Sequence, residues 1–334
     1  MARSANQRDL ARAAGVSVST VSRALSNSPG ISSGLRDQIH GLAKELGYEA
    51  RGAVPLSMRT IRTYVTVDVM SGGLVAFYSA LVEELKLAAT QAGLNLEVRL
   101  VRHSLELDRL ARDHDEAPVG ATLLVGLDPS AQIRAFFGRE RPVVLVNTFD
   151  PEMQFDCVAP ANFYGAAMAT RILLAAGHRH ILHLRDQIRW TTLQRQQGFF
   201  SAIESVAGAT GEIFDTAGGD AALAEVARSK ASGHANWTAV YAVHDSCAIR
   251  FVHALEEVGL RVPRDVSLIG FDDLPAASML TPRLSTLRVD YKAIGQQAIA
   301  LLLRRIAEPE CAPVQVDCAV SPVPGGTITQ FAHT

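Results

Sequence analysis

The chain reads DLARAAGVSVSTVSRALS over residues 9–26, a stretch that predicts two short helices with a tight turn between them. The first helix is expected over residues 9–14, and Gly15 supplies the backbone freedom that a tight turn needs. Ser17 can cap a second helix over residues 18–25. Two short helices joined by a turn with glycine are typical of a helix-turn-helix, whose second helix presents its N-terminal residues to base edges in the major groove of DNA.

A third helix is expected over residues 33–46, ending at Gly47. Its apolar residues recur at the spacing of one helical face. They are Leu35, Ile39, Leu42, Ala43 and Leu46. Because three amphipathic helices can also form a small core that never meets DNA, a plain packing module is the alternative interpretation.

Charge is distributed unevenly along the chain. Residues 1–62 hold nine Lys or Arg and four Asp or Glu, a net charge of +5, so the remaining 272 residues carry −7. A small basic head on an acidic body favours a polyanionic partner for the head alone. A solvated surface can produce the same imbalance, so this pattern supports the helix-turn-helix interpretation only in combination with it.

Residues 9–26, together with ELGY at residues 45–48, closely resemble the DNA-binding head of the lac repressor (LacI/GalR) family of transcription regulators. The resemblance implies a sequence-specific regulator, in the manner of a repressor, that binds a pseudo-palindromic operator. It assigns the reading of bases to Val18, Ser19 and Arg23. An arginine can donate two hydrogen bonds to guanine, worth roughly 1–3 kcal/mol of discrimination, whereas a valine can only touch a thymine methyl group.

The hydroxyl groups of Ser17, Thr20 and Ser22 are suited to DNA phosphates, which position a helix without reading sequence. Helix capping or exposure to solvent is the alternative for each. By the same resemblance, residues 49–60 are a hinge segment whose Leu56 enters the minor groove as a wedge. Pro55 departs from the usual hinge pattern and is unfavourable inside a helix, so a flexible linker is the alternative there.

Past residue 60, apolar runs of strand length alternate with amphipathic helical stretches. Strands are expected at residues 64–67, 121–125, 143–146, 181–184, 239–243 and 266–269, and helices at 77–92, 165–176, 194–206, 246–258 and 293–306. This alternation predicts an α/β fold with parallel sheets covered by helices on both faces. Such sheets bind ligands at the carboxyl ends of their strands.

This body resembles the effector domain of the same family, which is similar to type I periplasmic sugar-binding proteins. The strongest string is GLRVPRDVSLIGFDD at residues 259–273. The resemblance implies two doubly wound lobes, joined by three crossings, with a ligand cleft between them. The implied domains are a helix-turn-helix at 1–48, a hinge at 49–60 and a ligand-binding and dimerisation domain at 61–334. Within it, lobe 1 takes about 61–159 and 289–318, and lobe 2 about 160–288 and 319–334.

The resemblance also assigns residues to the cleft. Arg195 matches an arginine that binds ligand hydroxyls or carboxylates, and Asp272 a strand-end carboxylate that accepts from sugar hydroxyls. Phe77 and Tyr78 match an aromatic pair, and Trp190 is expected in a loop that faces the cleft. Ordinary packing between loops is the alternative for Trp190 and Phe77.

Two departures from the family pattern bear on the effector. His244-Asp245 stands where relatives have Asn-Asp, and this ring can change charge near neutral pH. Ala161-Asn162 stands where relatives usually have Asp-Asn, which removes one carboxylate from the cleft. The effector is expected to be a sugar, sugar acid or sugar phosphate, and the acidic classes suit Arg195 and His244 somewhat better.

Signals for other chemistry are weak. Three histidines fall within residues 178–183, but His180 and His183 of a strand point to opposite faces, which argues against a metal site. Residues 218–220 read GGD without the Gly-Lys-Ser/Thr of a phosphate loop, and no Gly-x-Ser-x-Gly elbow is present. We therefore expect no catalytic residue, no metal and no cofactor. A sensor protein without a DNA role and an α/β hydrolase are the alternatives.

Composition agrees with a globular protein, since 48% of the 334 residues are hydrophobic and 20% are charged. The chain has no run of ~18 apolar residues, and its N-terminus lacks the apolar stretch of a secretory signal. The four cysteines are scattered, as expected for thiols in a reducing compartment. The expected location is the bacterial cytoplasm, at the nucleoid and not at a membrane, and the expected assembly is a homodimer through both lobes of the body.

Overall fold

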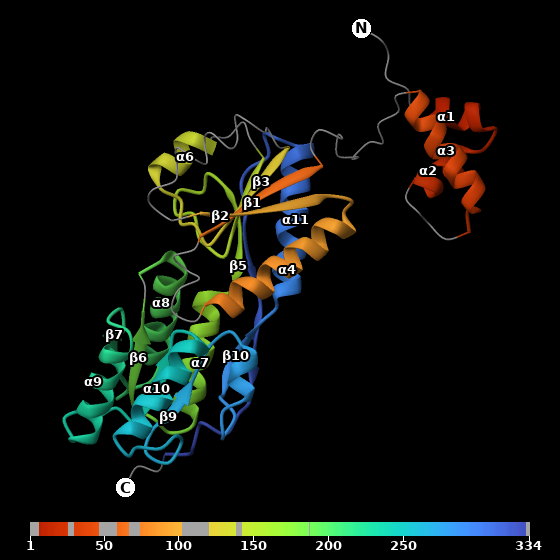
Figure 1. Ribbon diagram of the computed structural model, residues 1–334. Coiled ribbons are helices and arrows are strands. Elements are labelled where there is room, and N and C mark those ends of the chain that lie inside the picture. The colour runs from red at the N-terminus through yellow and green to blue at the C-terminus, as the bar shows by residue number, and fades with distance from the viewer. Residues whose placement is uncertain are drawn as a thin grey trace. The chain divides into compact units, whose positions relative to one another are not determined.

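The computed structural model describes residues 7–25, 30–46, 59–66, 74–101, 120–137, 142–186 and 188–331 (Figure 1). The chain divides into two compact units, residues 1–59 and residues 60–334. The predicted hinge residues Pro55 and Leu56 lie outside the described residues.

The first unit is a three-helix bundle of α1 (Gln7–Ala14), α2 (Val18–Leu25) and α3 (Ser33–Glu45). Its core is formed by the buried side chains of Leu10, Ala11, Val21, Ala24 and Ile39. Gly15 has a φ of 68° in the turn between α1 and α2, a conformation that glycine adopts at little cost. The predicted helix-turn-helix fold is confirmed.

The second unit contains two parallel sheets. The first is six-stranded with the order β11-β5-β4-β3-β1-β2. Its strands are β1 (Thr60–Thr66), β2 (Asn95–Val101), β3 (Ala121–Val125), β4 (Val143–Val146), β5 (Asp156–Pro160) and β11 (Gln315–Cys318). Helices α4 (Val75–Gln91) and α11 (Tyr291–Ala307) pack together on one face, and α6 (Ala131–Phe137) covers the other (Figure 1). We call this sheet with its helices lobe 1.

The second sheet is four-stranded with the order β7-β6-β8-β9. Its strands are β6 (His180–Arg185), β7 (Thr210–Asp215), β8 (Ala239–Ala242) and β9 (Ser267–Ile269). Its helices are α7 (Asn162–Ala175), α8 (Trp190–Glu204), α9 (Asp220–Ala231) and α10 (Asp245–Glu257), and the short 3-10 helix η3 (Pro275–Ser278) packs on α10. We call this sheet with its helices lobe 2. The predicted doubly wound α/β class is confirmed.

The chain passes between the lobes three times: from β5 to α7, from β10 (Thr286–Val289) to α11, and from β11 to β12 (Val320–Val323). Strands β10 and β12 form an antiparallel pair beside lobe 2. These short connections hold the lobes so that the carboxyl ends of strands in both sheets border the same space, where parallel sheets bind ligands.

One predicted boundary is wrong in a way that affects the site. The helix expected from residue 194 begins at Trp190, so Trp190 lies on α8 and not in a loop, whereas Arg195 lies on this helix as predicted. The hydroxyl oxygen of Thr192 accepts a hydrogen bond from the backbone N–H of Arg189 at 2.9 Å. This polar cap starts the helix ahead of its apolar periodicity.

No helix in the described part of the chain is both long enough and apolar enough to cross a membrane.

Candidate functional site

Helix α2 carries the predicted base-reading residues on its outer face. The side chain of Val18 is 41% exposed, and Ser19 and Arg23 are exposed as well. The opposite face of the helix buries Val21 and Ala24 in the three-helix core. The core therefore holds the helix in place while its exposed residues face outward, as recognition of a DNA groove requires.

The hydroxyl of Ser17 acts within the chain. Its Oγ accepts the backbone N–H of Thr20 at 3.1 Å and lies 2.8 Å from the hydroxyls of both Ser19 and Thr20. Ser17 thus caps α2, the role that the sequence offered as the alternative to a phosphate contact. Ser22 is exposed on the outer face, and Leu56 lies outside the described residues.

A cavity of about 40 Å³ lies between the lobes, space for a few water molecules. Lobe 1 contributes Leu74, Phe77, Tyr78 and Asn147, and lobe 2 contributes Asp186, Arg189, Thr191, Thr192, Arg195, His244 and Asp272. Asn147 and Asp186 directly follow strands, and His244 and Asp272 lie within three residues of strand ends, so the cavity occupies the place that the α/β fold predicts for a ligand.

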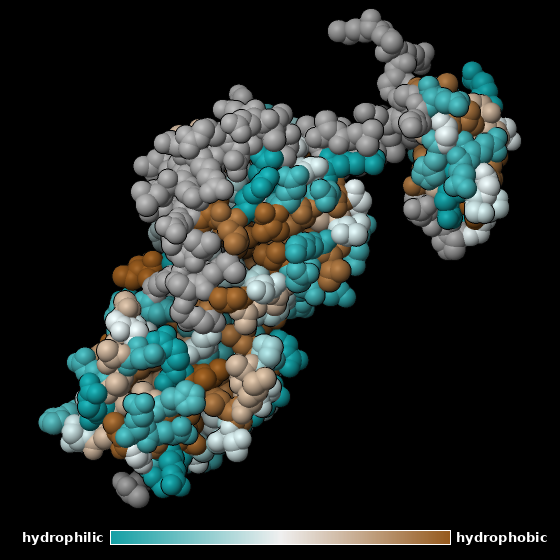
Figure 2. Space-filling view, in the orientation of Figure 1, coloured by the Kyte–Doolittle hydropathy of each residue, from teal (hydrophilic) through white to brown (hydrophobic). Residues whose placement is uncertain are grey.

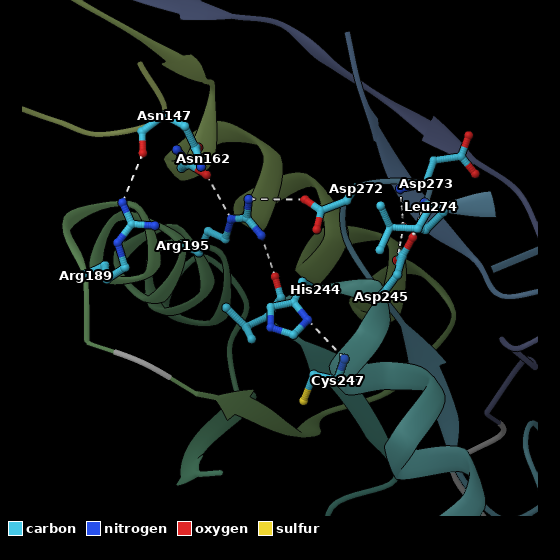
Figure 3. Close-up of polar contacts among 12 residues, drawn as sticks. Asn147, Asn162, Arg189, Arg195, His244, Asp245, Cys247, Asp272, Asp273 and Leu274 are labelled. Atoms are coloured by element: carbon cyan, nitrogen blue, oxygen red, sulfur yellow. Dashed lines mark hydrogen bonds and ion pairs between the residues drawn. The ribbon is translucent and has the colours of Figure 1, made fainter. Parts of the chain in front are cut away.

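Arg195 is the centre of the lobe 2 wall (Figure 3). Its Nε donates to Oδ1 of Asn162 at 2.8 Å, its Nη1 to the carbonyl of Val243 at 2.6 Å, and its Nη2 lies 3.4 Å from Oδ1 of Asp272. The residue is 6% exposed. These three partners, from three separate parts of lobe 2, fix the plane of the guanidinium. Its remaining N–H groups can then donate to a ligand.

Asp272 lies just beyond β9, with a φ of 111°. Its backbone N–H donates to the carbonyl of Leu287 at 2.7 Å, and this bond holds the unusual conformation in place. Burial raises the pKa of its carboxyl, and the nearby charge of Arg195 partly offsets that rise. The carboxylate is a strong acceptor held at the cavity wall.

His244 is the N-cap of α10. Its Nδ1 accepts the backbone N–H of Cys247 at 3.0 Å, so Nε2 carries the hydrogen that is donated to Oδ2 of Asp186 at 2.5 Å. The two side chains come from the ends of neighbouring strands β8 and β6. His244, at the position where the resemblance implies an asparagine, thus forms a hydrogen bond with a carboxylate.

A polar bridge links the lobes through Arg189. Its Nη2 donates to the carbonyl of Asn147 at 3.2 Å (Figure 3). Its Nη1 donates to the hydroxyl of Tyr78 at 2.8 Å, and its Nη2 also lies 3.4 Å from Oδ1 of Asp128. The hydroxyl of Tyr78 also accepts from Nδ2 of Asn147 at 2.9 Å. A Cβ on Gly126 would lie 2.8 Å from that hydroxyl, so glycine makes room for the tyrosine.

Five of the six predicted cleft residues line the cavity: Phe77, Tyr78, Arg195, His244 and Asp272. Trp190 is not in this lining, and its ring packs 6.1 Å from that of Phe149. Sequence reasoning missed Leu74, Asn147, Asp186, Arg189, Thr191 and Thr192. Asn147 and Asp186 each directly follow a strand, a position that could have indicated them.

The histidines of residues 178–183 serve the packing of lobe 2. His183 is fully buried, stacks on Tyr241 at 4.7 Å between ring centroids, and donates from Nδ1 to the Tyr241 carbonyl at 3.1 Å. The hydroxyl of Thr238 lies 2.8 Å from Nδ1 of His178. Among the described residues, no group of three or more His, Cys, Asp or Glu could hold a metal ion.

Comparisons with known proteins agree with both units. Residues 7–50 match the family described as bacterial regulatory proteins, lacI family, and residues 170–328 match a periplasmic binding protein-like domain. The HTH-type transcriptional regulator GalR of Escherichia coli (strain K12) is 32% identical over 309 residues, which cover 89% of this chain and 88% of GalR.

Solved structures show the same architecture. A complex of the transcriptional regulator CelR with cellobiose has a TM-score of 0.70 and 25% identity, covering 97% of this chain and 99% of CelR. The lac repressor dimer bound to operator and the anti-inducer ONPF has a TM-score of 0.70 at 20% identity, covering 98% of this chain and 100% of that structure. The latter likeness concerns the fold.

Proposed function

The chain belongs to the lacI family of bacterial regulatory proteins, and from this premise we propose that a neutral, polyhydroxylated effector of the sugar class binds between its lobes and controls its affinity for operator DNA. The observation that carries the proposal is the fixed pair of Arg195 and Asp272 at the cavity wall. A guanidinium with spare N–H groups beside a carboxylate offers donors and acceptors together, which is what a vicinal pair of hydroxyls needs.

The charges of the cavity favour a neutral effector over sugar acids and sugar phosphates. Arg195 faces Asp272, Arg189 faces Asp128, and His244 is bonded to Asp186. Each basic group thus already has a carboxylate at hand, and an anionic ligand would meet those carboxylates as well as the arginines. The sequence expectation that an acid suits Arg195 and His244 better has no support in this arrangement.

The polar groups that are unpaired suit hydroxyls. Oδ1 of Asn147 and Nε of Arg189 are buried and have no hydrogen-bond partner among the described residues. One is an acceptor and the other a donor, and a hydroxyl can serve either. The ring centroids of Phe77 and Tyr291 are 5.3 Å apart. Phe77 adds an apolar surface of the kind that packs on the C–H face of a sugar.

The matched relatives are transcription regulators along both head and body, which supports a regulator and not an enzyme or a sensor without DNA. We assign residues 1–48 to DNA binding, 49–60 to the hinge and 61–334 to effector binding and dimerisation, in the bacterial cytoplasm. Operator recognition is assigned to α2, with Val18, Ser19 and Arg23 reading bases.

We propose a homodimer assembled through both lobes of the body, with the outer surface of lobe 1 as part of the interface. Figure 2 shows hydrophobic surface over β2 and α4, and Leu87 of α4 and Leu100 of β2 are each 53% exposed. Exposed apolar side chains grouped on one surface are typical of interaction sites. Two heads in one dimer suit a pseudo-palindromic operator, with one head for each half-site.

The effector proposal can be tested by thermal unfolding of the full chain with neutral sugars such as ribose and cellobiose, and with gluconate and glucose 6-phosphate. Binding to the folded state raises the melting temperature. We expect at least one neutral sugar to do so, and Asp272→Asn to abolish the shift while Asp215→Asn, which alters an ion pair away from the cavity, retains it. Stabilisation by the anionic compounds alone would contradict the proposal.

A further inference from the structure

The contacts of Arg189 cross from one lobe to the other. The residue lies at the start of α8 in lobe 2, yet its guanidinium partners all belong to lobe 1: the Tyr78 hydroxyl at 2.8 Å, the Asn147 carbonyl at 3.2 Å and the Asp128 carboxylate at 3.4 Å. The side chains of Arg189 and Asp128 are 10% and 18% exposed. Water and salt therefore screen this pair less than a surface ion pair.

The lobe 1 side of the bridge is held in place before it meets Arg189. Oδ1 of Asp128 accepts from the hydroxyl of Thr148 at 2.5 Å, and Asn147 donates to Tyr78. Acceptors already fixed by their neighbours lose little conformational freedom when a guanidinium binds them.

A second contact lies directly beside the first. The backbone N–H of Trp190 donates to Oδ2 of Asp128 at 3.2 Å, and the ring of Trp190 packs 6.1 Å from that of Phe149. Asp128 thus accepts from two consecutive residues of lobe 2, once from a side chain and once from the backbone. Trp190, which the resemblance predicts to face the ligand cleft, takes part here in contact between the lobes.

We propose that Arg189 and Asp128 form a latch that holds the two lobes closed before any effector binds. Separating the lobes would break the ion pair, the bond to Tyr78 and the Trp190–Asp128 bond together, and would leave the buried acceptors of lobe 1 without these donors. The closed arrangement is therefore the favoured one in the effector-free chain.

The latch deepens the proposed function, because the apparent dissociation constant of a ligand is its intrinsic value divided by the fraction of chains in the binding-competent state. The closed cavity of about 40 Å³ has space for only a few water molecules, so a sugar can enter only after the latch opens. The latch would therefore weaken effector binding by keeping the binding-competent fraction low. Closure itself is a property of the chain alone, so it can be measured with no effector present, and its failure is distinguishable from failure of the effector proposal.

The test is a distance measurement by pulsed electron paramagnetic resonance on the full chain without effector. Spin labels are carried by a non-natural amino acid at Met153 of lobe 1 and Glu225 of lobe 2, both exposed, and labelled chain is diluted in excess unlabelled chain. Asp128→Asn removes the charge and keeps the size of the side chain, and Arg189→Gln removes the guanidinium. Asp215→Asn is the control, since its ion pair with Arg185 lies within lobe 2.

We expect the parent chain and the control to give one narrow distribution, and both latch variants to gain a population at longer distance, at least several-fold above the parent. The double variant should gain less than the sum of the two single effects, because the two residues share one ion pair although each also makes a contact of its own between the lobes. Circular dichroism verifies that each variant is folded. Because the two single variants are independent, the test still stands if one of them does not fold. Distributions unchanged in every folded latch variant, or a broad open distribution in the parent chain, would overturn the proposal.

Discussion

The guanidinium carbon of Arg195 lies 3.7 Å from the centroid of the Phe271 ring, and Phe271 directly precedes Asp272. The planar guanidinium stacks on the face of this ring, a geometry that arginine can adopt and lysine cannot. The Phe271 ring packs closely against Gly165 of α7, where a Cβ atom would lie 2.7 Å from the ring. This close contact holds the ring in place. The side chains of Arg195, Asp272 and Phe271 are thus held in place together.

Arg195→Lys should therefore abolish the response to effector although the charge is kept. An ammonium group cannot reach the Asn162 side chain, the Val243 carbonyl and Asp272 at once. The measurement is the melting shift with the effector found by the sugar screen, together with operator affinity in its absence. Arg250→Lys, in the surface pair with Asp220, is the matched control and should respond normally. A normal response from Arg195→Lys would remove Arg195 from the site.

Gly198→Ala should destabilise lobe 2. A Cβ at this position of α8 would lie 2.0 Å from the carbonyl oxygen of Phe163 in α7, so the two helices would have to move apart. Overpacking of this kind costs typically 1–3 kcal/mol. Denaturant unfolding measures the loss, and Gly208→Ser serves as a comparison without a clash, since nothing lies within 4 Å of its position, although its φ of 75° adds some strain. Equal stability of Gly198→Ala and the parent chain would show that α7 and α8 pack less closely than described.

The sequence predicts strands that are continuous apolar runs better than strands of mixed composition. Strands β3 and β4 match the predicted residues 121–125 and 143–146, because fully buried parallel strands are continuous apolar runs. The predictions lack strands β2, β5 and β7, since all three mix polar and apolar residues, as in TGEIFD of β7. Their formation depends on a neighbour that supplies the hydrogen bonds.

The candidate site also divides into residues that a local sequence pattern predicts and residues that only the fold brings together. Arg195 and Asp272 follow from the family resemblance, because each lies in a recognisable local string. Arg189 and Asp128 have no such string, and they are 61 residues apart. Their contact exists only because the crossings between the lobes bring α8 to the end of β3, a relation that no local periodicity contains.

His183 should make the chain less stable as the pH falls below neutrality. Burial lowers the pKa of its imidazole from 6.5 to about 4, and the bond to the Tyr241 carbonyl offsets this only in part. The unfolded chain thus takes up the proton first, so the contribution of neutral His183 is complete above pH 6.5 and lost as the pH falls from 6.5 towards 4. The loss between pH 7.5 and pH 5 should be about 2 kcal/mol.

The comparison with a His183→Phe variant isolates this contribution. Phenylalanine can keep the stack on Tyr241 but cannot be protonated, so its unfolding free energy should fall less than that of the parent chain between pH 7.5 and pH 5. Asp245 and Asp272 act in the opposite direction, because burial raises the pKa of each, and they are common to both chains. His253→Gln, at an exposed position, controls for the loss of one histidine. Identical slopes for all three chains would contradict the assignment.

Arg23→Ala should weaken binding to the operator far more than binding to random DNA. Arg23 is exposed on α2, and its Nη2 lies 3.0 Å from the place of a Cβ on Gly30, so its guanidinium rests beside the turn that precedes α3. A guanidinium held at the edge of the recognition helix can donate to guanine through two hydrogen bonds. Loss of such a contact costs roughly 1–3 kcal/mol on the specific sequence.

The operator is obtained first by selection from random duplexes, and affinities of the parent chain and variants are then compared on operator and on scrambled DNA over a series of salt concentrations. Arg12→Ala removes the same charge from the exposed side of α1 and controls for general electrostatics. If Arg23 reads a base, its loss lowers the ratio of specific to non-specific affinity, and the preference at one operator position relaxes. If Arg23→Ala instead lowers both affinities equally and flattens the salt dependence, Arg23 contacts a phosphate, and base reading by α2 falls to Val18 and Ser19.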